Sequence, residues 1–291
     1  MATVRVGFIG LGAMGLPMAE RLLRAGFPVV AVRHRDHRGP TALTAAGGRV
    51  VDTPAALAPL VDVVVTMLPS SREVEAVVTG EAGLEPDLRP GQVVLDMGTS
   101  DPAATRALAA RLAPRGVDVV DAPVSGGVRG AVDGTLLIMV GGAPAAVARV
   151  RPILEALGSH LVHVGPVGAG HTLKLVNNHV ALTTMAVLAE AMALVRAAGL
   201  SPTDALQALR HGSADSAMLR ALAHRLQTRQ FEPGFRIRLA HKDLTLVQRL
   251  ADALGVSLRV GASARLILEE ALARGQGERD IAALAADLDV S

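Results

Sequence analysis

The sequence contains no cysteine, no tryptophan and no tyrosine, and it has only four phenylalanines in 291 residues. Without cysteine the chain can form no disulfide, bind no zinc through thiolates and use no thiol nucleophile. Without tyrosine it cannot use a dehydrogenase mechanism in which a tyrosine hydroxyl supplies the proton. A chain with no cysteine fits a reducing compartment, so we expect a cytoplasmic protein.

The shortage of aromatic residues also bears on partners. The pI of about 9.8 is weak evidence for nucleic acid, because the net charge is only +2. Single-stranded nucleic acid usually stacks on aromatic side chains in a basic groove, so we expect no nucleic-acid partner. The first ten residues contain Arg5 and a short apolar run, which predicts a strand and not a signal peptide. No stretch of about 20 uninterrupted apolar residues is present, so we expect no membrane partner.

Lysine is nearly absent as well. Of 29 lysines and arginines, only Lys174 and Lys242 are lysine. Arginine does not give up its proton in proteins, whereas lysine can. The two lysines are therefore candidates for proton transfer or for a compact ammonium contact, with chance retention as the alternative.

The order of apolar segments predicts the fold class. Up to about residue 164, apolar runs of strand length alternate with helical stretches, which is typical of an α/β Rossmann-type domain with a mostly parallel sheet. Beyond Gly170 only helical segments follow. We therefore predict a dinucleotide-binding domain over residues 1–164 and an all-helical substrate and dimerisation domain over residues 165–291 that begins with a long helix. The predicted strands are Val4–Ile9, Val29–Val32, Val63–Met67, Val93–Asp96, Val117–Val120, Leu136–Val140 and Leu161–Val164, and the predicted C-terminal helices are Leu173–Ala198, Pro202–Arg210, Ala240–Leu254 and Leu258–Ala273.

A glycine-rich turn follows the first predicted strand and opens a helix that ends near Ala25. In this turn Gly10 suits a tight bend, Gly12 lets a pyrophosphate approach the backbone, and Gly15 lets the helix pack on the strand. The helix N-terminus offers free N–H groups to the phosphate. An ordinary strand-to-helix turn is the alternative, but the position after the first strand favours a dinucleotide site. The predicted cofactor residues here are Gly10, Leu11, Gly12, Ala13, Met14 and Gly15.

The end of the second predicted strand bears on the choice of cofactor. It reads Arg33-His34-Arg35-Asp36, and guanidinium groups match the geometry of a 2′-phosphate. We therefore predict that Arg33, His34 and Arg35 favour NADP(H), with NAD(H) possible if Asp36 takes the ribose hydroxyls instead.

Further motifs accompany the glycine turn in a fixed order. Together they resemble the β-hydroxyacid dehydrogenase family, which includes 3-hydroxyisobutyrate dehydrogenases, tartronate semialdehyde reductases and glyoxylate/succinic semialdehyde reductases. The resemblance covers nearly the whole chain. The motifs are Gly7-Phe-Ile-Gly-Leu-Gly-Ala-Met-Gly15, Met67-Leu-Pro69, Asp96-Met-Gly-Thr-Ser100, Asp121-Ala-Pro-Val-Ser-Gly-Gly127, Gly170-His-Thr-Leu-Lys-Leu-Val-Asn-Asn178 and Lys242-Asp-Leu244.

The loop after Asp121 and the residues around Met67 and Thr99 have expected roles in ligand binding. From the residues alone, the loop after Asp121 predicts an anion cradle, because consecutive N–H groups and a hydroxyl can surround a negative charge; a simple turn is the alternative. The resemblance implies that Ser125, Gly126 and Gly127 hold a substrate carboxylate. It also implies that the nicotinamide end of the cofactor is surrounded by Met67, Leu68, Pro69 and Thr99.

Lys174 and Asn178 are the predicted catalytic pair. They stand four residues apart, so on a helix they share one face. A lysine desolvated in a closed cleft can protonate the alkoxide that develops during carbonyl reduction and recover the proton in oxidation. The resemblance implies that Lys174 is the general acid/base and that Asn178 helps to bind substrate. It further implies that Lys242, expected at the start of a helix, reaches the cofactor, although a structural ion pair is an alternative for Lys242.

These features predict an NADP-preferring oxidoreductase that transfers a hydride between NADPH and a small semialdehyde or hydroxyacid bearing a carboxylate. One alternative is an imine reductase, which Lys174 disfavours because those enzymes generally lack lysine at the proton-donor position. Another is a non-catalytic dinucleotide-binding regulator. We expect no metal, because His160 and His163 flank a short strand with no acidic partner nearby. The long apolar helix suggests a homodimer or homotetramer.

Overall fold

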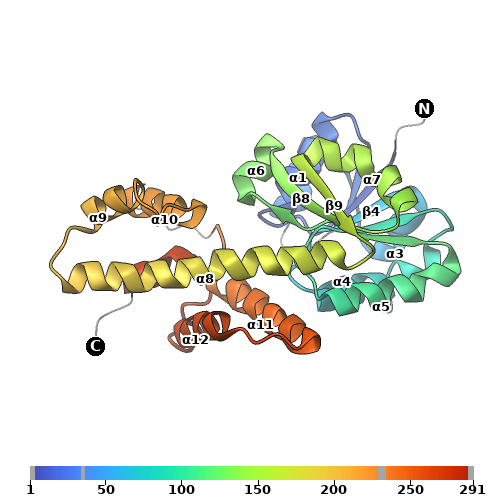
Figure 1. Ribbon diagram of the computed structural model, residues 1–291. Coiled ribbons are helices and arrows are strands. Elements are labelled where there is room, and N and C mark those ends of the chain that lie inside the picture. The colour runs from blue at the N-terminus through green and yellow to red at the C-terminus, as the bar shows by residue number, and fades with distance from the viewer. Residues whose placement is uncertain (1–3, 34–36, 229–233, 288–291) are drawn as a thin grey trace. The chain divides into compact units, whose positions relative to one another are not determined.

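The computed structural model describes residues 4–33, 37–228 and 234–287. The chain forms two compact units, Met1–Lys174 and Leu175–Ser291, and the division falls inside the longest helix, α8 (Ala169–Ala197) (Figure 1).

The first unit is built on a nine-stranded sheet. Its strand order is β3-β2-β1-β4-β5-β6-β8-β7, with β9 paired to β8. The first six strands in the chain run parallel, β8 pairs antiparallel with β6 and β7, and β9 runs parallel to β8. The strands are β1 (Val6–Ile9), β2 (Val29–Val32), β3 (Arg49–Val51), β4 (Val63–Thr66), β5 (Val93–Asp96), β6 (Asp118–Asp121), β7 (Val124–Ser125), β8 (Leu136–Gly141) and β9 (Gly158–Gly165).

Alternation along the β-branched strands divides the apolar side chains between two layers. Phe8 of β1 belongs to the core that includes residues of α1, α2, α6 and α7, whereas the adjacent Ile9 belongs to the core that includes residues of α3, α4 and α5. Both faces of the sheet are therefore covered by helices, as a parallel sheet requires (Figure 1). The helices are α1 (Gly15–Arg24), α2 (Arg38–Ala45), α3 (Pro54–Leu57), α4 (Ser71–Thr79), α5 (Pro102–Leu112), α6 (Gly127–Asp133) and α7 (Pro144–Leu157).

The register places four residues in one row at the carboxyl ends of adjacent strands. Ile9 of β1 pairs with Thr66 of β4, Thr66 with Asp96 of β5, and Asp96 with Asp121 of β6. Chain order reverses between β1 and β4, and open α/β sheets bind ligands at such a reversal. The row therefore marks the functional edge of this unit.

The second unit is all helical in the residues described. It comprises the part of α8 from Leu175 onward together with α9 (Pro202–Leu209), α10 (Ala217–Thr228), α11 (Ile237–Leu254), α12 (Arg259–Ala273) and α13 (Leu284–Asp287). Its core consists mostly of leucine, alanine and methionine side chains; Leu175, Met185, Leu222 and Leu268 are among those buried there.

The predicted fold class is confirmed: a Rossmann-type α/β unit with a mostly parallel sheet precedes an all-helical unit that contains most of the long helix. All seven predicted strands are present within a few residues of their predicted ends. The three-residue strand β3, the two-residue strand β7 and helix α10 were not predicted. The prediction that Lys242 begins a helix is wrong, because α11 starts at Ile237 and Lys242 lies in its second turn.

Candidate functional site

The glycine turn joins β1 to α1, and its three glycines have different surroundings. Gly10 has a φ of 107°, and a Cβ there would lie 2.3 Å from the carbonyl oxygen of Met67. A Cβ on Gly15 would lie 1.8 Å from the carbonyl oxygen of Gly10, whereas one on Gly12 would meet nothing within 4 Å. Gly10 and Gly15 are thus required by packing, and Gly12 leaves an open approach to the backbone.

The start of α1 can accept an anion. The N-cap residue of α1 is Met14, and among the described residues no side chain forms a capping hydrogen bond with this helix start. The N–H groups of a first helical turn have no partner within the helix, and the helix dipole places partial positive charge there. The uncapped turn and the open backbone at Gly12 together suit the pyrophosphate of a dinucleotide.

Basic side chains follow the end of β2. Arg33 is half-exposed and forms an ion pair with Asp52, with 2.8 Å between Nε and Oδ1. A hollow of about 430 Å³ beside it is lined by residues that include His37 and Thr41. His34 and Arg35, the other predicted 2′-phosphate ligands, lie outside the described residues.

The loops after β4 and β5 continue the same edge of the sheet. The amide of Met67 donates to the carbonyl of Ile9 at 2.9 Å, and that of Met97 donates to the carbonyl of Thr66 at 2.9 Å. A Cβ on Gly98 would lie 2.8 Å from the carbonyl oxygen of Leu68, so the two loops pack closely. The loops place Leu68, Pro69 and Thr99 beyond the carboxyl ends of β4 and β5.

The predicted anion loop follows β6. Ser125 ends β7 and is half-buried, and Gly126 and Gly127 are exposed and open α6. Both glycines have positive φ angles, 132° and 64°. A Cβ on Gly127 would meet nothing within 4 Å. The loop thus exposes backbone at a point where only glycine adopts the conformation without strain.

The first turn of α8 is bonded to the end of β6 by one carboxylate. Asp121 Oδ1 accepts from the amide of Gly168 at 2.6 Å, and Oδ2 accepts from the amide of His171 at 2.8 Å. Burial raises the pKa of Asp121, and the charge of His171 and these N–H groups oppose the rise. Asp121 thus caps α8 from a distant element and fixes the helix start to the sheet edge.

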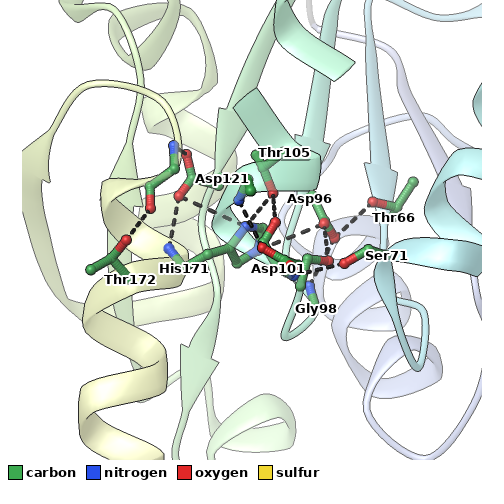
Figure 2. A network of polar contacts seen from close by, with 12 residues as sticks. Thr66, Ser71, Asp96, Gly98, Asp101, Thr105, Asp121, His171 and Thr172 are labelled. Atoms are coloured by element: carbon green, nitrogen blue, oxygen red, sulfur yellow. Dashed lines mark hydrogen bonds and ion pairs between the residues drawn. The ribbon is translucent and has the colours of Figure 1, made fainter. Parts of the chain in front are cut away.

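A buried polar network surrounds this carboxylate (Figure 2). Asp96 Oδ1 accepts from the hydroxyl of Thr66 at 3.0 Å and from the amide of Gly98 at 3.1 Å, and Oδ2 accepts from the hydroxyl of Ser100 at 2.6 Å. The imidazole of His171 lies between the two carboxylates, with Nε2 3.6 Å from Asp96 Oδ2 and Nδ1 3.9 Å from Asp121 Oδ2. The network therefore connects β4, β5 and β6 to α8.

Lys174 lies three residues after His171, and Asn178 four residues after Lys174. Spacings of three and four place the three side chains along one face of α8. All three are buried: His171 is 0% exposed, Lys174 9% and Asn178 6%. Full burial of polar side chains is uncommon, and the other buried side chains of α8 are apolar.

A second polar cluster lies within the helical unit. The amide nitrogen of Asn178 donates to Asp243 Oδ2 at 2.6 Å, and Lys242 Nζ lies 2.9 Å from Asp243 Oδ1. Asp243 is 1% exposed. The buried carboxylate thus joins Asn178 to Lys242, two residues that the sequence predicted separately.

Sequence reasoning overlooked the buried acids and the histidine. It gave no role to Asp96, Asp121 or His171, although all three lie within the motifs quoted above. The position of His171, one helical turn before Lys174 on the same face, was the available signal.

Comparison with known proteins gives the family. The model of the family described as the NAD binding domain of 6-phosphogluconate dehydrogenase matches residues 5–165. The model described as the NAD-binding region of NADP-dependent 3-hydroxyisobutyrate dehydrogenase matches residues 168–288. The chain belongs to the β-hydroxyacid dehydrogenase family. The resemblance inferred from its motifs is confirmed.

Members of this family resemble the chain along nearly its whole length. A 2-(hydroxymethyl)glutarate dehydrogenase of Eubacterium barkeri is 37% identical over 97% of this chain and 94% of that protein. A 2-hydroxy-3-oxopropionate reductase of Escherichia coli is 37% identical over 99% of this chain and 98% of that protein. The structure of Psf3 in complex with NADP+ and 2-OPP superposes with a TM-score of 0.89 at 26% identity, covering 98% of this chain and 100% of that chain.

Family membership makes the protein an oxidoreductase that uses a nicotinamide dinucleotide. The residues fit such a cofactor, because the open backbone at Gly12, the uncapped start of α1 and the loops after β4 and β5 lie along one sheet edge.

Proposed function

We propose that the protein is an NADP-preferring hydroxyacid dehydrogenase that reversibly reduces a small semialdehyde bearing a carboxylate, with Lys174 as the general acid/base. The observation that carries the proposal is the position of Lys174. It is a buried lysine in a chain with only two lysines, and its helix is bonded through Asp121 to the sheet edge that begins at the glycine turn.

The chain's own part in the reaction is the movement of a proton and the orientation of substrate. When bound, the nicotinamide supplies or takes up the hydride. Lys174 Nζ donates a proton to the carbonyl oxygen as negative charge develops on it, and takes the proton back during oxidation. No metal ion is needed to stabilise the alkoxide if the ammonium group does so. Asn178, one turn further along α8, orients the substrate with its side-chain amide.

The loop of Ser125, Gly126 and Gly127 accounts for the carboxylate on the substrate. Its hydroxyl and exposed backbone can surround an anion, and it follows the end of β6, to which α8 is also bonded. The names of the relatives agree with substrates of this kind: the Escherichia coli protein is a 2-hydroxy-3-oxopropionate reductase.

The preference for NADP(H) rests on the basic run that begins at Arg33. Arg33 follows β2, the position where such folds contact the adenosine ribose, and its guanidinium is already oriented by Asp52, which follows β3. The ion pair is exposed, so a phosphate can compete for the guanidinium at little cost. We propose that Lys242 is a further cofactor ligand, held by Asp243.

We also propose a homo-oligomer. Leu173, Val180, Val187 and Leu194 recur every seven residues along α8, and each is at least 36% exposed. A heptad repeat of apolar residues is the pattern by which helices pack on one another. The occupant that fits it is the same stripe of a second copy, because a two-fold axis pairs a surface with itself.

The first experiment is a substrate panel. The purified protein would be mixed with NADPH or NADH and with succinic, methylmalonic or tartronic semialdehyde or glyoxylate, and the loss of reduced nicotinamide absorbance would be followed. We expect turnover with at least one aldehyde, faster with NADPH than with NADH. A simple aldehyde without a carboxylate is the control and should react poorly. Absence of turnover across the panel would contradict the proposal.

A further inference from the structure

His171 is a fully buried histidine that takes no part in the reaction described above. Its side chain is 0% exposed and lies between Asp96, which is 2% exposed, and Asp121, which is 0% exposed. Burying an imidazole between two carboxylates is costly unless the groups satisfy one another. An apolar side chain would fill the same space without that cost, so simple packing does not explain a histidine here.

A hydrogen bond joins one ring nitrogen of His171 to α5. Nδ1 of His171 lies 2.8 Å from the hydroxyl oxygen of Thr105. That hydroxyl also lies 3.1 Å from the carbonyl oxygen of Asp101. The imidazole and the hydroxyl are therefore part of one buried chain of hydrogen bonds (Figure 2). The bond between His171 and Thr105 attaches the first turn of α8 to α5.

The loop after β5 approaches the same histidine from the other side. Nε2 lies 3.6 Å from Asp96 Oδ2, which is within ion-pair distance but too far for a hydrogen bond, and Asp96 accepts from the amide of Gly98 and the hydroxyl of Ser100. Thr99 lies between these two residues. The imidazole is thus in contact both with the network that shapes the Thr99 loop and with the helix turn that precedes Lys174.

We propose that His171 is a positioning residue: through Thr105 and Asp96 it fixes the rotation of the first turn of α8, and so the position of the Lys174 ammonium relative to the loop around Thr99. His171, Lys174 and Asn178 lie along one helix face, so a rotation of the first turn would displace Lys174 directly. Displacement of a reacting group by about 1 Å can cost on the order of 100-fold in rate. The inference rests on the proposed role of Lys174 in proton transfer.

Two substitutions of His171 distinguish its positioning role from the mere filling of space by its side chain. In His171→Asn the side-chain amide occupies the place of Nδ1 and can still form a hydrogen bond with Thr105. In His171→Gln it reaches the place of Nε2 and loses the Thr105 bond. The matched control is His160→Gln, at an exposed histidine of β9. The measurements are kcat, the KM for aldehyde, the Kd for cofactor, the melting temperature and the solvent deuterium isotope effect on kcat.

We expect His171→Gln to lower kcat at least ~10-fold and to raise the solvent isotope effect, because proton transfer becomes slower than the other steps. Its cofactor Kd should stay within about 3-fold of the wild-type value, a change of less than 1 kcal/mol. His171→Asn should recover most of kcat, and His160→Gln should match the wild type. A double-mutant cycle of His171→Gln with Thr105→Val should be non-additive in kcat, because both changes break one bond.

The proposal is overturned if His171→Gln retains wild-type kcat and isotope effect. It is also overturned if His171→Asn and His171→Gln lower the melting temperature and kcat to the same extent with no change in the isotope effect, because a purely structural residue would give that result. Failure of the proposed function is recognised separately: the wild-type protein would then show no turnover, or Lys174→Ala would retain full activity.

Discussion

Asp243 shows how one buried residue can join two predicted functions. It accepts from Asn178 and pairs with Lys242, and it is 1% exposed. Removing one partner of a buried charged group leaves the others unsatisfied. The residue therefore links the asparagine assigned to substrate and the lysine assigned to the cofactor.

We predict that Asp243→Asn raises the KM for both aldehyde and cofactor by about 10-fold, the equivalent of about 1.4 kcal/mol for each ligand. The amide keeps the volume but loses the charge that holds Lys242. Asp252→Asn, at an exposed acid of the same helix, is the matched control and should leave both KM values unchanged. Steady-state kinetics decides the matter, and an unaltered KM for both ligands would show that the pair is only structural.

The basic run at residues 33–35 carries a prediction about cofactor choice. Arg35→Asp should weaken NADPH binding by about 10-fold or more while leaving NADH binding similar, because a carboxylate repels the 2′-phosphate and can accept from the ribose hydroxyls. Arg24→Asp, the same charge change at an exposed position at the end of α1, is the control. Titration calorimetry with each cofactor measures the effect. An unchanged NADPH to NADH ratio would place selectivity elsewhere.

Single residues differ in how well the sequence predicts them. The shared helix face of Lys174 and Asn178 could be predicted from their four-residue spacing, and the rarity of lysine singled out Lys174 as a candidate. Asp96, Asp121 and His171 could not be joined from sequence, because their contact depends on strand register and on where α8 begins. Burial decides their chemistry, and burial is a property of the folded chain.

At the scale of elements, the turn between β1 and α1 contains two glycines, Gly12 and Gly15, that have different reasons to be glycine. A Cβ on Gly12 meets nothing within 4 Å, while one on Gly15 would overlap the carbonyl oxygen of Gly10 at 1.8 Å. The fold therefore requires glycine at position 15, and ligand approach accounts for glycine at position 12.

We predict that Gly12→Ala retains the melting temperature of the wild type but weakens cofactor binding at least ~10-fold, because the methyl group stands where the phosphate approaches. Gly15→Ala should instead destabilise the fold by ~1–3 kcal/mol, the usual cost of overpacking. Thermal unfolding and cofactor titration of both variants test this contrast. Equal effects of the two substitutions on stability would contradict it.

Helix α11 carries a titratable group with a shifted pKa. Burial lowers the pKa of His241, and Glu269 and Arg265 act on it in opposite directions. Because the unfolded chain binds this proton more readily, the contribution to stability is present above the ordinary histidine pKa of about 6.5 and is lost as the pH falls from there through the lowered pKa of the folded state.

His241→Gln should therefore flatten the fall in unfolding free energy between about pH 7 and pH 5. Urea unfolding at several pH values measures the slope, and His224→Gln at an exposed position of α10 controls for the loss of a histidine. If His241→Gln and the wild type show the same slope, the side chain is not buried as described.

Elements were predicted where the hydrophobic pattern is long. The seven predicted strands are mostly uninterrupted apolar runs rich in valine, leucine or isoleucine, as expected of a sheet covered on both faces. The strands β3 and β7 have only three and two residues, too few for periodicity to register. Helix α11 begins earlier than predicted because Ile237 is buried in the helical core and extends the apolar stripe toward the N-terminus.

At the scale of the whole molecule, the apolar character of α8 has two possible causes, insertion into a bilayer or contact with another protein surface. Among the described residues, α8 is the helix that is long enough and apolar enough to cross a bilayer by length and composition, and 33% of its most apolar 18 residues is buried. Its polar stripe of His171, Lys174 and Asn178 is buried, and its exposed heptad of apolar residues suits a second helix. We therefore favour self-association through this heptad.

Val187→Asp should weaken the oligomer by placing a charge in the contact, with a shift toward monomer in sedimentation equilibrium. Val256→Asp is the control, since Val256 has similar exposure, 50% against 52%, but lies outside α8. Dissociation by both substitutions, or by neither, would argue against the heptad as the interface.

Proton transfer by Lys174 is tested most directly by comparing Lys174→Ala with Lys174→Arg. Arginine keeps the positive charge but does not release a proton. We predict that both substitutions lower kcat by ~10²–10⁴, the usual contribution of a general acid, with cofactor Kd nearly unchanged. Near wild-type kcat in Lys174→Arg would show that charge alone is needed, and near wild-type kcat in Lys174→Ala would contradict the account.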